Sequence, residues 1–143
     1  MIDPVAGEAT TGFNPESLWS GIGGLRGHLD RHYFCHPGPE PIDDVHIEKA
    51  RDYVKQIRRD IPKDAGAIPG ITEGQVANIK KIDSTLSWIW TCVTKRANNG
   101  RYKIPRSLVD DLGKCNSRLS EMVNEQRMKR LEKSKKELFA RMS

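Results

Sequence analysis

Residues 72–97 (TEGQVANIKKIDSTLSWIWTCVTKRA) constrain the fold more than any other part of the chain, because they form its longest regularly periodic apolar stretch. Thr72 followed by Gln75 predicts a capping box at the start of a helix, and residues 98–100 (NNG) predict its end. Apolar residues form two adjacent stripes at three- and four-residue steps: Val76, Ile79, Leu86, Trp90 and Val93, and beside them Ile82, Ile89 and Cys92. A helix with two buried stripes needs neighbours on more than one side, so this segment is predicted to be the central helix of a bundle.

Three further helices are predicted, at about 14–34, 43–61 and 105–126. The first is indicated by its start signal, with Asn14 as cap and Pro15 in the first turn. The other two have apolar stripes at helical spacing. No segment has the strict alternation of a half-buried strand. The predicted fold is therefore an all-α, four-helix bundle-like single domain over 14–126. A flexible N-terminal arm (1–13) is predicted before it, and an extended basic C-terminal helix (127–143) after it.

The first predicted helix contains an unusual number of glycines. Gly21, Gly23, Gly24 and Gly27 lie within seven residues. Each glycine inside a helix costs about 1 kcal/mol relative to alanine. The cluster indicates either a break near 21–24 or a close helix–helix approach there.

Overall composition favours a soluble protein inside the cell, in the cytoplasm or nucleus. The chain has 143 residues and a net charge of +5. No apolar run reaches the roughly 18–20 residues that a membrane span needs. Three widely spaced cysteines imply no disulfide framework, which fits a reducing compartment.

Positive charge is concentrated in two blocks. Residues 127–141 contain seven cations and two acids, which accounts for the whole net charge, and residues 95–106 contain five cations and no acid. Clustered, mobile cations bind phosphates, and Tyr102 in residues 95–106 could stack on a base. The predicted nucleic-acid-binding residues are Lys95, Arg96, Arg101, Tyr102, Lys103, Arg106, Arg127, Lys129, Arg130, Lys133 and Lys136.

The leading hypothesis is thus a non-enzymatic protein that binds nucleic acid, RNA in particular, or a nucleoprotein, through loop 95–106 and the C-terminal helix. An ordinary solvated loop and helix surface would have a similar composition. Small helical modules with basic ends also occur in viruses and phages, which is a likeness of form only.

The alternative hypothesis is a helix-mediated adaptor or an oligomeric structural protein. Leu131 and Leu138 are seven residues apart on the C-terminal helix, with Met128 and Met142 nearby, and could pack against a partner helix or a second copy. Trp88 lies off the apolar face of its helix, so it is either covered by the N-terminal segment or exposed as an anchor for a partner.

Metal binding and catalysis have weaker support in the sequence. His28 and His32, one helical turn apart, with Cys35 or His36, are weak candidates for a small structural zinc site. The H-E-x-x-H pattern fails at Leu29, and no nucleophile or phosphate-loop motif occurs. Neither a cofactor nor an enzymatic activity is expected.

Overall fold

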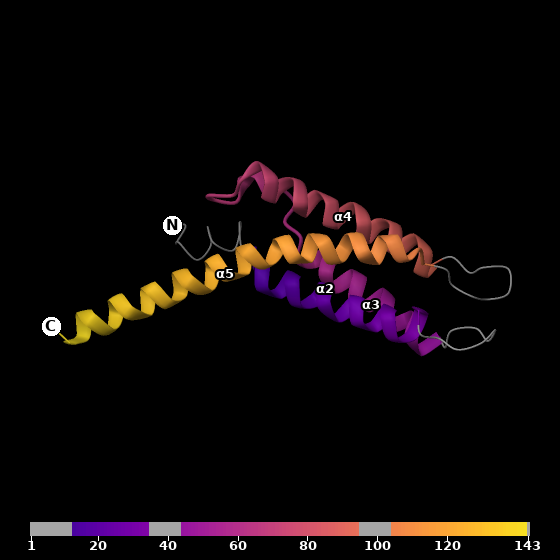
Figure 1. The fold of residues 1–143 in the computed structure, drawn as a ribbon, viewed down its shortest axis with the longest axis horizontal. Coiled ribbons are helices and arrows are strands. Elements are labelled where there is room, and N and C mark those ends of the chain that lie inside the picture. The colour runs from indigo at the N-terminus through magenta and orange to yellow at the C-terminus, as the bar shows by residue number, and fades with distance from the viewer. Residues whose placement is uncertain (1–12, 35–43, 95–103, 143) are drawn as a thin grey trace, which may run out of the picture.

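The computed structural model describes residues 13–34, 44–94 and 104–142, which form an all-α bundle of four helices (Figure 1). The elements are α2 (Pro15–Leu29), which continues into a π-helical turn η1 (Asp30–Phe34), α3 (Asp44–Asp60), a 3-10 turn η2 (Ala65–Ala67), α4 (Glu73–Thr94) and α5 (Arg106–Met142). No strand occurs in these three ranges. The predicted fold class is confirmed. Of the predicted arm only Phe13 is described, and it packs against the core.

Each helix packs on two others. α2 contacts α3 and α5, and α4 contacts α3 and α5, so the four helices surround one shared core. The core consists of aliphatic side chains from all four helices, among them Leu18, Ile22, Leu25, Leu29, Val54, Ile57, Ile82, Leu86, Ile89, Leu112 and Leu119. Burial of these apolar side chains is the main stabilising term for a domain of this size.

Local sequence signals fix where two of the helices begin. The Asn14 side chain accepts hydrogen bonds from the backbone N–H groups of Glu16 and Ser17, as expected of an N-cap. The predicted capping box is present: Thr72 N–H donates to Gln75 Oε1 (3.0 Å), and Gln75 N–H donates to Thr72 Oγ1 (3.1 Å).

The glycine cluster marks a close helix contact and not a break. α2 runs through residues 21–24 without interruption. A Cβ on Gly21 would lie 3.0 Å from Ile57 Cγ1, and a Cβ on Gly24 would lie 2.9 Å from Tyr53 Cε1. The cost of glycine in the helix is offset because α3 can approach α2 at these two positions.

The buried face of α4 differs from the predicted one in its centre. Ile82, Leu86 and Ile89 are fully buried, whereas Trp90 is only half-buried. The Lys55 Nζ lies 5.7 Å from the centroid of the Trp90 ring. The centre of the buried face therefore lies between the two predicted stripes, and the large Trp90 ring covers the edge of the core.

Two buried asparagines connect neighbouring helices. Asn78 Nδ2 of α4 donates to the Cys115 carbonyl oxygen of α5 (3.0 Å), and Asn116 Nδ2 of α5 donates to the Trp19 carbonyl oxygen of α2 (3.3 Å). Because an unpaired amide would be costly in the core, both bonds favour a single register of α5 against its neighbours.

Candidate functional site

The second half of α5 extends beyond the bundle (Figure 1). The last buried residue of α5 is Val123, and every residue from 127 to 142 is exposed. We call residues 127–142 the α5 tail. At 1.5 Å per residue the tail is about 24 Å long. The predicted extension is thus helical and continuous with the last helix of the bundle.

Two arginines attach the start of the tail to α2. Arg127 Nη2 lies 2.6 Å from Glu16 Oε1, and Arg130 Nη1 lies 3.4 Å from Glu16 Oε2. The Arg127 guanidinium also lies 5.9 Å from the centroid of the Trp19 ring. Hydrogen bonding and charge from Arg127, with a smaller contribution from Arg130, lower the pKa of Glu16. Both predicted phosphate-binding arginines are therefore engaged within the chain.

Three predicted phosphate-binding lysines share one face of the tail. Lys129, Lys133 and Lys136 follow at steps of four and three residues, so their side chains leave the helix on one side, one turn apart. All three are exposed, and no carboxylate of the described chain lies within 4.0 Å of their amino groups. We call these residues the lysine row. Their charge is available to an anionic ligand.

Large apolar side chains lie on the opposite face of the tail. They are Met128, Leu131, Leu138, Phe139 and Met142, which are 55–73% exposed, and we call them the tail stripe. At 3.6 residues per turn, the tail stripe is rotated by about 120° around α5 from the buried positions of residues 109–123. The tail stripe therefore does not continue the bundle-facing side of α5.

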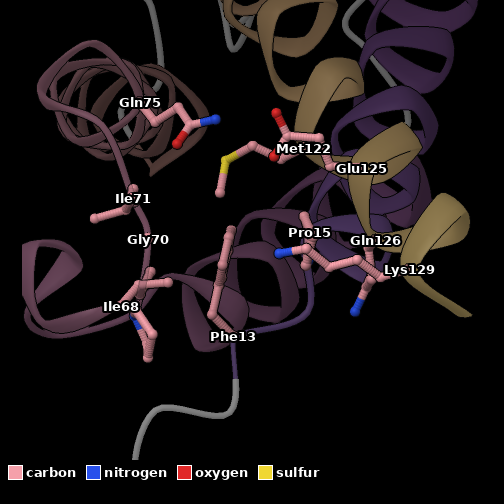
Figure 2. Close-up of a pocket in the computed structure, with 11 residues that line it drawn as sticks. Phe13, Pro15, Ile68, Gly70, Ile71, Gln75, Met122, Glu125, Gln126 and Lys129 are labelled. Atoms are coloured by element: carbon pink, nitrogen blue, oxygen red, sulfur yellow. The ribbon is translucent and has the colours of Figure 1, made fainter. Parts of the chain in front are cut away.

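A small pocket lies where the tail leaves the bundle. It has a volume of about 150 Å³, and Phe13, Ile68, Ile71, Met122 and Lys129 are among its lining residues. Figure 2 shows the side chains of Phe13 and Met122 facing the same space. A cavity of roughly this volume can hold one benzene-sized ring. Because Lys129 belongs both to the pocket and to the lysine row, a ring in the pocket would lie close to a bound phosphate.

Of the five cations in residues 95–106, only Arg106 lies within the described residues. Lys95, Arg96, Arg101, Tyr102 and Lys103 lie outside the described residues. Arg106 Nη2 lies 3.6 Å from Asp30 Oδ1, and its guanidinium lies 5.0 Å from the centroid of the Phe34 ring. Arg106 thus joins the start of α5 to the end of the first helix.

Trp88 lies on the exposed face of α4. It is 63% exposed, in contrast to the fully buried Ile89 beside it. No described residue covers it, so the covered alternative would require a segment outside the described ranges. Trp88 lies on α4 and does not belong to the α5 tail.

Three histidines come together between α2, η1 and α3. The ring centroids of His32 and His46 are 3.6 Å apart and stacked, and those of His28 and His32 are 4.6 Å apart. His28 Nε2 lies 2.7 Å from the His46 carbonyl oxygen. Burial is the largest cause of the lowered pKa values of His28 and His32, and nearby positive groups including Lys49 and Arg31 lower them further.

The histidine cluster does not have the geometry of a metal centre. Within the three described ranges, no group of three or more His, Cys, Asp or Glu residues could hold a metal ion. One nitrogen of His28 is occupied by a backbone carbonyl, and His32 and His46 stack face to face. The other weak candidates, Cys35 and His36, lie outside the described residues.

Comparisons with protein-family models, curated proteins and solved structures gave no match for this chain. None of the helices in the described ranges is long and apolar enough to cross a membrane.

Sequence reasoning missed the full extent of the tail stripe. It selected Leu131 and Leu138 with Met128 and Met142 nearby, whereas Phe139 lies on the same face and was not selected. The signal is present in the spacing, since positions 128, 131, 138 and 142 fit one heptad pattern with Lys135 between the two leucines. On one helical projection with residues 109–123, these positions lie on a different side of α5.

Proposed function

We propose that this protein is a non-enzymatic binding protein that holds RNA, alone or within a nucleoprotein, on the lysine row of the α5 tail. The main supporting observation is that Lys129, Lys133 and Lys136 are aligned, exposed and without an ion-pair partner among the described residues. Cations at one-turn spacing can contact successive phosphates, and such contacts provide most of the sequence-independent affinity for nucleic acid.

Two further features favour RNA over a general polyanion. The pocket beside Lys129 is large enough for one aromatic ring, so an unpaired base could enter it while its phosphate contacts the lysine row. Tyr102 and the cations of residues 95–106 stay part of this proposal, since a tyrosine ring can stack on a second base. The arginines that bind Glu16 hold the start of the tail in place and add little direct affinity.

A salt titration tests the proposal. The full chain should bind a short single-stranded RNA at about 50 mM salt, and the logarithm of the affinity should fall linearly with the logarithm of salt concentration. Replacing all three lysines of the row by alanine should flatten this slope by about 0.7 for each phosphate that the variant no longer binds. Lys114→Ala provides a matched control, because Lys114 is an exposed lysine on the bundle part of α5. Equal slopes for the triple variant and the wild type, or no RNA affinity in the wild type, would refute the proposal.

A further inference from the structure

The tail stripe is an apolar surface that the bundle does not use. Its five side chains are each more than half exposed, although similar side chains on residues 109–123 are buried. Isolated surface leucines are ordinary, but several large apolar side chains on one face of an exposed helix mark an interaction site. The stripe is rotated by about 120° from the bundle-facing side of α5. A segment that packed on the bundle-facing side would therefore leave the tail stripe uncovered.

Charge at the stripe restricts the kind of partner. Lys135 occupies the heptad position between Leu131 and Leu138, in the middle of the apolar surface. Arg141 lies on one flank of the stripe, and in the described chain neither Lys135 nor Arg141 has a carboxylate within 4.0 Å. A helix that covered the stripe would bury the Lys135 stem, so it would have to supply an acidic group for the ammonium.

A second copy of this chain fits the stripe poorly. Two parallel, in-register tails would place Lys135 against Lys135, and any pairing would bring together two segments with seven cations and two acids each. A tail of sixteen residues is also shorter than the three or so heptads typical of coiled coils, so hydrophobic contact alone has little area with which to overcome that repulsion.

A lipid surface also fits poorly. The lysine row and Arg130 project from the side of the helix that faces away from the tail stripe. If the stripe were embedded in a bilayer, these cations would point away from the anionic headgroups. Lys135 would also interrupt the centre of the inserted face.

We propose that the tail stripe docks an acidic amphipathic helix of a partner protein, with a carboxylate of that helix paired to Lys135. The leucines, the methionines and Phe139 contact the apolar side of the partner, and Arg141 faces an acidic flank. This surface lies on the opposite side of the tail from the lysine row, so the proposal does not depend on RNA binding. A tail with both surfaces could join a protein to a nucleic acid.

Designed peptides test this proposal on the full chain. The probe is a helical peptide of about three heptads with leucines in its core, glutamates on its flanks and one glutamate at the central core position. Its counterpart has lysine in place of every glutamate. Fluorescence anisotropy should show that the protein prefers the acidic peptide by about tenfold or more. Leu131→Gln and Leu138→Gln should each weaken that binding by about tenfold, because each removes a leucine that the peptide would bury.

The central pairing has its own control. A third peptide differs from the acidic one only by lysine at the central core position. Wild-type protein should prefer the central glutamate, and Lys135→Glu should reverse this preference. Lys114→Glu makes the same charge change on the bundle part of α5 and should keep the wild-type preference. All the substituted residues are exposed or partly so, and circular dichroism checks that each variant is folded.

Three results would overturn the proposal. The first is equal affinity of the wild type for the acidic and the lysine peptides, or a preference that Lys135→Glu leaves unchanged. The second is that the protein binds neither peptide and sediments as a dimer, and that Leu131→Gln dissociates this dimer. A second copy would then cover the stripe. The third is leucine-dependent binding to phosphatidylserine vesicles without peptide binding, since lipid would then be the occupant.

Discussion

The two halves of α5 have the same backbone conformation and different physical roles. Residues 106–126 place Leu112 and Leu119 in the core and accept a hydrogen bond from Asn78, whereas residues 127–142 bury no side chain. The apolar positions rotate around the helix at the boundary, and the cations concentrate beyond it. Helix propensity and continuity with the bundle thus maintain the tail, while tertiary packing stabilises the first half. The difference shows that periodicity identifies a helix, but only the phase of that periodicity shows which neighbour a face requires.

Two leucines of α5 give the sharpest contrast. Leu119→Ala should reduce the free energy of unfolding by about 2–5 kcal/mol, because Leu119 is fully buried and its removal leaves a cavity. Leu131→Ala should change it by about 0.5 kcal/mol or less, because Leu131 is 56% exposed. Urea denaturation followed by circular dichroism measures both. If the two variants lose similar stability, the tail is packed in solution and the comparison fails.

Residues 95–106 and the tail should differ in how they contribute to RNA binding. Tyr102→Ala should weaken single-stranded RNA binding by the roughly 1–3 kcal/mol of one stacked base and leave the salt slope nearly unchanged, because the ring has no charge. The triple lysine-row variant should change the slope instead. Anisotropy titrations of both variants at several salt concentrations separate the two effects. A changed slope for Tyr102→Ala would mean that the ring positions the neighbouring cations and does not stack.

Acid should affect the bundle and spare the tail. Since the pKa values of His28 and His32 are lowered in the folded state, the unfolded chain binds more protons near their ordinary value of 6.5. The contribution of the two histidines to folding stability is therefore fully present above that pH. It is lost as pH falls through 6.5 toward the folded pKa values. Besides the two rings themselves, the charged groups of the described residues that shift these pKa values are His46, Lys49 and Arg31, all of them basic. The tail contains no histidine, so this effect is confined to the bundle.

Denaturation midpoints between pH 7.5 and 5.5, measured beside RNA affinity in the same buffers, check this prediction. The midpoint should fall with pH, and His28→Gln should reduce the dependence because it removes one titrating ring. A midpoint that rises on acidification would contradict the prediction, because it would mean that the histidines gain a carboxylate partner in the folded state.

Much of the fold could be predicted because its determinants are local. The Thr72–Gln75 box and the helical stripes depend on residues within a few positions of one another, so the helices and their order follow from the sequence. The centre of the buried face of α4 could not be predicted from the sequence. Its two adjacent apolar stripes are equivalent until the neighbouring helices pack against them. The glycines near 21–24 likewise have a meaning only once Ile57 and Tyr53 pack against them.

The candidate site shows the same division. Composition was sufficient to find the cations of residues 127–141. It could not distinguish those that pair with an acid of the bundle from those that are left exposed. Glu16 is 111 residues away from Arg127 in the sequence, and their ion pair separates the anchoring arginines from the lysine row only in three dimensions.

Hydrogen–deuterium exchange along α5, with and without single-stranded RNA, distinguishes a packed first half of the helix from an exposed, RNA-binding tail. In the absence of RNA, amides of residues 109–123 should be strongly protected. Those of residues 130–142 should exchange much faster, because every side chain of that part of the helix is exposed. RNA should slow exchange in the tail and leave the bundle half nearly unchanged. Equal protection of both halves without RNA would mean that the tail is packed in solution, and a tail whose exchange RNA does not alter would mean that it does not bind RNA.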